Sequence, residues 1–306
     1  MRISNSMLTD DFLYDNNQIQ QGLVKIQTQL STNTKIQTIS DDVGLSLSSI
    51  EWETQLSKSQ TYSKNVDSGK DFLNNSLSAL GSINTDVQNI ISQATSSNNA
   101  LNSQNYSTIE ATIKNYLSSI VQTMNTQYNG MYLFGGTNNK AAPITINADG
   151  TAAVTTISSV DSNGKTVNTP VDLTGEVKTQ VSSASSIAIN IPGSSVVATG
   201  IFDSINQIIN SLQSGQAPDA TAINTLEASY QGLLNIQSTG GSTYNRLDNI
   251  SQQLATQQTN LQTMITNKLK VDPAQLSIDL QNQQYLLQMS DKILATTLSK
   301  SLLDYI

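Results

Sequence analysis

The sequence contains no cysteine and no histidine. Their absence excludes Ser-His-Asp and Cys-His catalysis, zinc sites built on His or Cys, haem ligation by these residues and iron–sulfur clusters. Asp10-Asp11 and Asp41-Asp42 are paired carboxylates, but adjacent residues point in different directions on a helix, so neither is a ready acid/base couple. We therefore expect no enzyme, no cofactor and no metal site.

Charged residues are also scarce, at 12% of the 306 residues against about a quarter in an ordinary soluble domain. Lys and Arg number 15 against 23 Asp and Glu, for a formal net charge of −8. An acidic chain without a basic cluster predicts no nucleic-acid partner, because phosphates need cationic side chains for most of the affinity.

Long apolar runs are missing as well, since none approaches the 18 or so residues of a membrane helix. We expect no membrane insertion. Asp10 and Asp11 interrupt the N-terminal segment before any apolar stretch typical of a secretory signal peptide, so export would need another route.

Neutral polar residues replace the missing charge. Ser 41, Thr 33, Asn 31 and Gln 29 together make 134 of the 306 residues. Contacts between segments of this composition should depend only weakly on salt, because few ion pairs are available to be screened.

Apolar residues recur at helical spacing at both ends of the chain. Asp272-Pro273 marks the start of the C-terminal helix, because an N-cap carboxylate precedes a proline whose fixed angle suits the first helical position. Each terminal stripe needs a partner helix, either the other terminus or a copy in another molecule. The predicted assembly interface comprises Leu8, Phe12, Ile19, Leu23, Ile26 and Leu30 with Leu276, Leu280, Leu287, Leu294, Leu298, Leu302 and Leu303.

A segment rich in Ser, Thr, Asn and Asp, 31–44, follows the N-terminal helix. Such side chains hydrogen-bond locally to the backbone and compete with regular structure. We predict a hinge here, at Ser40, Asp41, Asp42 and Gly44.

The middle of the chain returns to helical spacing after Gly44 and again beyond about Gly200, with a break at Gly240-Gly241. Between Pro143 and about Gly200 the period falls towards two, and Asp-Gly and Asn-Gly pairs at 149–150 and 163–164 predict hairpin turns. This segment is expected to form a self-contained β-rich unit with its own small core.

The predicted fold class is mainly α: a discontinuous, coiled-coil-like helical bundle built from both the N- and C-terminal segments, with a small inserted β-rich domain. Three domains are expected. They are a terminal helical assembly domain (1–42 plus 271–306), a helical core domain (43–142 plus 199–270) and the inserted domain (143–198).

Four stretches carry more specific motifs: MRISNSM at 1–7, LSTNTKIQTISDDVG at 30–44, YNGMYLFGG at 128–136 and SLLDYI at 301–306. Together they resemble the flagellin superfamily, and specifically its hook-associated protein 3 family. Asn33 stands where the family usually has Gly, a mild departure because Asn tolerates a left-handed turn better than most residues.

The resemblance implies a structural component of the bacterial flagellum that joins the hook, via hook-associated protein 1, to the flagellin filament. The implied partners are hook-associated protein 1, flagellin, a flagellar export chaperone and further copies of the chain in a ring. The implied location is the extracellular hook-filament junction, reached by type III flagellar export without a cleaved signal peptide.

Three alternatives remain: a minor flagellin filament subunit, a secreted adhesin whose β insertion binds a ligand, and a carboxylate-dependent enzyme. The enzyme would need convergent acids, which the sequence does not offer. The ending at 301–306 resembles the junction family and is absent from flagellins, so we favour the junction protein.

Overall fold

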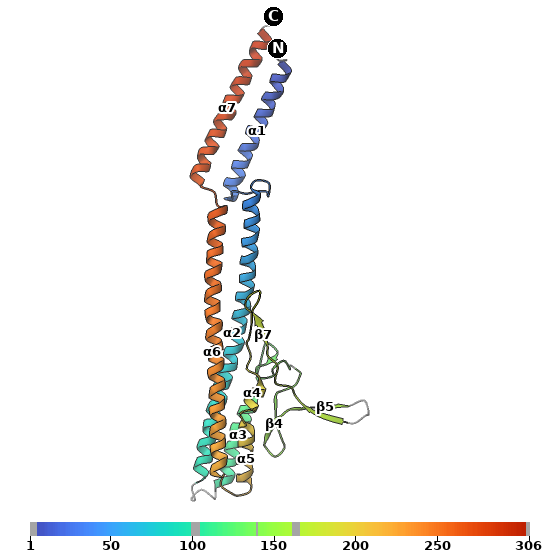
Figure 1. The fold of residues 1–306 in the computed structure, drawn as a ribbon, viewed down its shortest axis with the longest axis vertical. Helices are drawn as coiled ribbons and strands as arrows, with labels where there is room; N and C mark the ends of the chain where they lie inside the picture. Colours follow the sequence, from blue (N-terminus) through green and yellow to red (C-terminus); the bar gives the residue numbers. More distant parts are fainter. Residues whose placement is uncertain (1–4, 99–104, 139, 161–165, 304–306) are drawn as a thin grey trace. The chain divides into compact units, whose positions relative to one another are not determined.

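The computed structural model describes residues 5–98, 105–138, 140–160 and 166–303. The described part of the chain is mainly helical, which confirms the predicted fold class (Figure 1). Its helices are α1 (Asn5–Thr32), α2 (Val43–Ser97), α3 (Tyr106–Met124), α4 (Gly193–Val197), α5 (Ile201–Gln213), α6 (Ala220–Leu269) and α7 (Pro273–Leu303). Its strands are β1 (Gln127–Tyr128), β2 (Met131–Tyr132), β3 (Ile144–Ile146), β4 (Ala152–Val154), β5 (Thr156–Val160), β6 (Thr166–Pro170), β7 (Lys178–Gln180) and β8 (Ser186–Ala188).

The chain forms two compact units, and α2 and α6 each contribute to both. Unit 1 comprises residues 1–58 and 257–306, and unit 2 comprises residues 59–256. The division therefore falls within these two long helices and not at their ends.

Unit 1 contains α1 and α7, which lie side by side (Figure 1). Asp272 begins α7 as predicted: its Oδ1 accepts a hydrogen bond from the Ala274 N–H at 2.9 Å, and Pro273 is the first helical residue. Asp42 begins α2 in the same way, with its Oδ1 accepting from the Leu45 N–H at 2.9 Å. Both helix starts are thus set by a local aspartate.

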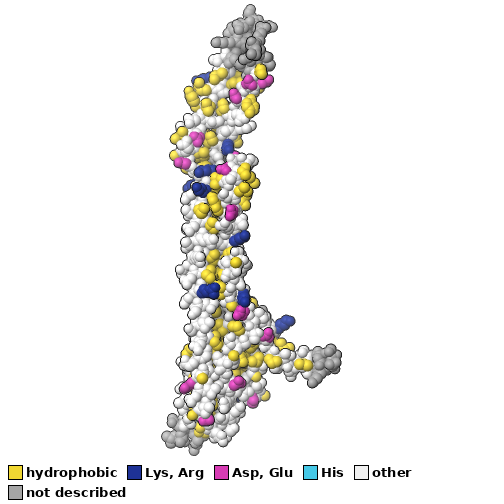
Figure 2. Space-filling view, viewed as in Figure 1, with side chains coloured by type: hydrophobic (Ala, Val, Ile, Leu, Met, Phe, Trp, Pro, Cys, Tyr) yellow, Lys and Arg dark blue, Asp and Glu magenta, His cyan; other side chains and the backbone are white. Residues whose placement is uncertain are grey.

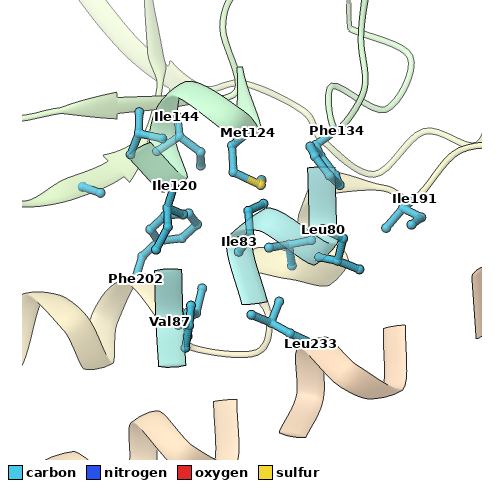
Figure 3. Packing of buried hydrophobic residues seen from close by; sticks show 14 of the residues in the cluster. Leu80, Ile83, Val87, Ile120, Met124, Phe134, Ile144, Ile191, Phe202 and Leu233 are labelled. Atoms are coloured by element: carbon cyan, nitrogen blue, oxygen red, sulfur yellow. The ribbon is translucent and has the colours of Figure 1, made fainter. Parts of the chain in front are cut away.

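Unit 2 has one continuous hydrophobic core, to which helices and insertion both contribute. Figure 3 places Leu80, Ile83 and Val87 of α2 near side chains of α3, α5 and α6, with Ile144 and Ile191 of the insertion in the same cluster. The expectation of a separate core for the insertion is wrong. Its described sheets have two strands of three to five residues, too few to bury a face without the helices.

The insertion is built from hairpins. Each of its described sheets is an antiparallel pair: β3 with β4, β5 with β6, and β7 with β8. The short pair of β1 with β2 precedes the insertion. The turn at Asp149-Gly150 is present between β3 and β4, and Gly150 has a positive φ of 84°. The predicted Asn163-Gly164 turn lies outside the described residues, although the strands on either side of it pair with each other.

The predicted break at Gly240-Gly241 is wrong, because α6 continues through both glycines. A Cβ at Gly240 would lie 2.8 Å from Leu77 Cδ2 and 3.3 Å from Ile191 Cδ1. Gly240 therefore makes room for α2 and the insertion to approach α6, and its packing role outweighs its poor helix propensity.

Candidate assembly interface

The predicted terminal stripes face each other within one chain. Phe12, Ile19, Leu23 and Ile26 of α1 are half-buried, while Leu30 is exposed at the helix end. On α7, Leu276 is buried and Leu280, Leu287 and Leu294 are half-buried. The side chains of Leu8, Leu298, Leu302 and Leu303 lie outside those that the structure describes. Of the two partners that the sequence offered, unit 1 therefore pairs each stripe with the other terminus, and their role between subunits stays a prediction.

A glycine on α1 receives a glutamine of α7 in this pair. A Cβ at Gly22 would lie 2.5 Å from Gln283 Nε2, which donates a hydrogen bond to the Ile19 carbonyl at 3.1 Å. This side-chain amide thus satisfies a backbone carbonyl of the neighbouring helix, in addition to the apolar contacts.

A second set of apolar side chains lies on the opposite faces of α1 and α7. Tyr14 is 64% exposed and Tyr285 is 62% exposed, and each lies two residues, or about 200°, from the half-buried Phe12 or Leu287. Figure 2 shows hydrophobic side chains gathered on the surface of this helix pair. We define the outer apolar surface as Met7, Leu13, Tyr14 and Val24 of α1 with Ile278, Tyr285, Leu286, Met289 and Ile293 of α7.

This second set is not among the interface residues predicted from the sequence. The sequence contains a signal for it, because Ile278, Tyr285, Met289 and Ile293 follow steps of seven and four residues. The predicted stripe of α7, called the inner stripe below, has the same steps at Leu276, Leu280, Leu287 and Leu294. A helix that is apolar on two faces has more than one partner surface.

The start of α2 carries a further exposed apolar stripe. Val43, Leu47 and Ile50 are each more than half exposed, as is Ile39 in the connector before them. The spacing of four and three residues places the α2 members on one helix face.

Three of the four predicted hinge residues, Ser40, Asp41 and Asp42, lie in the connector 33–42, which Asp41 holds to α1. The carboxylate accepts hydrogen bonds from Lys25 Nζ at 2.7 Å and from the backbone N–H groups of Gln37 and Thr38, both at 2.9 Å. These donors, Lys25 first, hold the pKa of Asp41 well below its usual range because they favour the ionised form. Ser40, Asp42 and Gly44 are exposed, and Gly44 already lies in the first turn of α2.

Further hydrogen bonds shape the connector. The Gln37 side-chain amide donates to Thr32 Oγ1 at 2.6 Å and to Thr34 Oγ1 at 2.9 Å. Asn33 adopts a positive φ of 55°, the left-handed conformation for which Asn is better suited than most residues. The connector is thus a folded loop, and hinge motion at these residues stays a prediction.

The two chain connections of unit 1 are also tied to each other. Thr34 and Lys270 form an antiparallel β-bridge, and the Lys35 N–H donates to the Leu269 carbonyl at 2.7 Å. The end of α6 is therefore bonded to the connector that follows α1.

Within the residues that the structure describes, no cluster of three or more Asp or Glu side chains could hold a metal ion. Nor does any described helix combine the length and hydropathy needed to span a membrane. The features of unit 1 that call for a partner are apolar and neutral polar surfaces.

Residues 3–139 match the family model of the bacterial flagellin N-terminal helical region. This chain carries a flagellin-type N-terminal region. The resemblance of the sequence to the flagellin superfamily is therefore confirmed. The comparison with curated proteins finds no match.

Solved structures with a similar fold include flagellar proteins. A protein of Vibrio parahaemolyticus described as flagellar hook-associated aligns with a TM-score of 0.61 and 18% identity, over 75% of this chain and 100% of that one. The flagellar junction protein FlgL from Legionella pneumophila aligns with a TM-score of 0.54 and 11% identity, over 74% of this chain and 100% of that one. FlgL from Bacillus cereus aligns with a TM-score of 0.53 and 17% identity, over 71% of this chain and 99% of that one. At these identities the likeness establishes the fold, which this chain shares with them.

Proposed function

We propose that this chain is a structural component of the bacterial flagellum that forms the junction between the hook, via hook-associated protein 1, and the flagellin filament. The observation that carries the proposal is the outer apolar surface of the α1–α7 pair. Monomeric proteins rarely expose so many large apolar side chains together, and such surfaces mark sites of protein–protein contact.

Apolar packing is the stronger of the forces available to this surface. Burying one large apolar side chain contributes roughly 1.5 to 3 kcal/mol, whereas an exposed ion pair contributes about 0 to 1 kcal/mol. The described charges on α1 are Asp10, Asp11, Asp15 and Lys25, and Lys25 is already paired with Asp41. We therefore expect neighbouring subunits to be held mainly by the outer apolar surface, with weak dependence on salt.

The same surface suits the partners and the route proposed for the chain. Further copies, flagellin and hook-associated protein 1 would bury it in the assembled flagellum, and a flagellar export chaperone would cover it before type III export. The names of the structural neighbours, which include a flagellar junction protein, support this assignment.

The test places a charge on the outer apolar surface. In flagellated cells whose own junction protein has been replaced by this chain, Tyr14→Asp and Tyr285→Asp should reduce the fraction of cells with filaments at least tenfold. Gln253→Asp, at an exposed neutral position of α6 in unit 2, is the control and should keep filaments. Immunoblots of the culture fluid report export separately. Normal filament numbers in both tyrosine variants would contradict the proposal.

A further inference from the structure

A groove of about 440 Å³ lies between α1 and the connector 33–42. Amide and hydroxyl side chains dominate its lining, which comprises Asn17, Gln20, Gln21, Val24, Lys25, Thr28, Gln37, Thr38 and Asp41. Its two charged groups, Lys25 and Asp41, are paired at 2.7 Å, so the groove presents no net charge to a partner. These features disfavour a charged ligand.

The groove opens away from α7 of the same chain. Val24, which lines it, is 62% exposed and belongs to the outer apolar surface, whereas the adjacent Leu23 is half-buried on the inner face. The groove thus continues the surface that we assign to subunit contacts, and the chain's own α7 occupies the opposite face of α1.

Asp41 fixes the wall that the connector contributes. Its carboxylate binds Lys25 of α1 and the N–H groups of Gln37 and Thr38, and Thr38 and Gln37 both line the groove. The bond from Lys25 ties the connector to α1, and the two backbone bonds fold the connector itself. Without them this part of the connector would not be held in place as the wall of the groove.

We propose that this groove is the docking site for helix α7 of a second copy of the chain. Gln281, Gln284 and Gln288 of α7 are exposed and spaced three and four residues apart, so they form one amide stripe. Each amide both donates and accepts hydrogen bonds, which matches a neutral lining of amides and hydroxyls. Tyr285, beside this stripe, supplies an apolar ring for Val24.

The chain already contains a contact of this kind. Gln283 of α7 reaches the Ile19 carbonyl of α1 through the space left by Gly22. A glutamine of α7 bound to α1 is therefore a recognition mode that these two helices use within one subunit, and the groove offers it on the other face. This inference rests on the proposed function and names the contact by which one copy holds the next.

Disulfide cross-linking tests it directly, because the chain has no cysteine of its own. Two chains would be co-expressed in flagellated cells, one carrying Gln21→Cys and the other Gln284→Cys, and the isolated flagella would be oxidised and separated on non-reducing gels. The matched control replaces Gln284→Cys by Asn282→Cys, an exposed amide about 200° around the same helix. We expect at least ten times more linked dimer from the first pair.

Equal dimer from both pairs, or none from the first pair in flagella that contain both chains, would overturn the groove assignment while leaving the proposed function standing. Absence of both chains from isolated flagella would overturn the proposed function, and the groove assignment with it. In the background of the first pair, Asp41→Ala should reduce the linked dimer at least tenfold, whereas Asp42→Ala, which removes only the cap of α2, should not. Unchanged cross-linking in Asp41→Ala would show that Asp41 does not position the groove.

Discussion

The backbone carbonyl oxygen of Phe134 lies where a side chain at Gly193 would begin: a Cβ there would be 2.2 Å from that oxygen. Phe134 is fully buried, and Gly193 is the first residue of α4. A backbone atom cannot swing aside as a side chain can, so this contact admits only glycine. It joins the end of the insertion to the segment that follows α3.

We therefore predict that Gly193→Ala lowers the free energy of unfolding by about 1 to 3 kcal/mol, the cost of overpacking a buried site. Gly81→Ala is the matched control within α2, where the nearest atom to the added Cβ would be Gln237 Nε2 at 3.8 Å. That change should stabilise the protein by up to about 1 kcal/mol, because alanine is the better helix former. Urea unfolding followed by circular dichroism measures both. Equal effects of the two substitutions would contradict the packing argument.

The β5–β6 hairpin should be dispensable for folding, unlike the rest of the insertion. The described side chains of residues 156–159 and 166–170 are all exposed, and the hairpin is closed at its base by the Val171 N–H donating to the Thr155 carbonyl at 2.8 Å. Replacing 156–170 by Gly-Gly should change the free energy of unfolding by no more than about 0.5 kcal/mol. Ile187→Ala, at a position 5% exposed, should cost about 2 to 5 kcal/mol. A hairpin deletion as costly as Ile187→Ala would refute this division.

Gly22 and Gln283 should be energetically coupled. Gly22→Ala displaces the Gln283 amide, and the lost hydrogen bond of about 1 kcal/mol offsets a gain in helix propensity of about 1 kcal/mol. The substitution should be close to neutral in the natural chain and stabilising by about 1 kcal/mol in a Gln283→Ala background. Thermal unfolding of the four proteins of this double-mutant cycle gives the coupling. Additive effects would mean that the two side chains do not compete for the same space.

The connector should stay closed in mildly acidic solution. The pKa of Asp41 is lowered in the folded chain by Lys25 and the N–H groups of Thr38 and Gln37. A carboxyl with a lowered folded pKa contributes stability above its unfolded value of about 4 and loses that contribution as the pH falls towards the folded value. The Gln37 and Thr38 amides should therefore remain protected from hydrogen exchange at pH 5 and lose protection only below about pH 4.

Nuclear magnetic resonance of the Asp41 carboxyl carbon, together with exchange of those two amides, measures this behaviour. Asp41→Asn removes the titrating group, so the pH dependence of amide protection attributable to it should disappear. Titration of Asp41 at or above pH 4 would be inconsistent with the hydrogen bonds described.

Local signals in the sequence predicted local structure well. Asp272-Pro273 marked the start of α7, and Asp149-Gly150 marked the turn between β3 and β4. These features depend on residues within a few positions of one another, so sequence spacing determines them.

Features that depend on distant residues could not be predicted in this way. Gly240-Gly241 resembles a helix break, and only the approach of Leu77 and Ile191 explains why Gly240 lies inside a helix. Periodicity likewise identified the inner stripe of α7 but could not say whether its partner is α1 of the same chain or of another. Asp41 was selected as a hinge residue, yet its bond to Lys25, sixteen residues away, holds the connector closed.

The bond between Lys35 and Leu269 has a mechanical consequence. A pulling force on α1 passes through the connector 33–42, and a force on α7 passes through the short link after α6. The Thr34–Lys270 bridge joins these two connecting segments. A force that pulls on either terminal helix is therefore shared with the other until this bridge breaks.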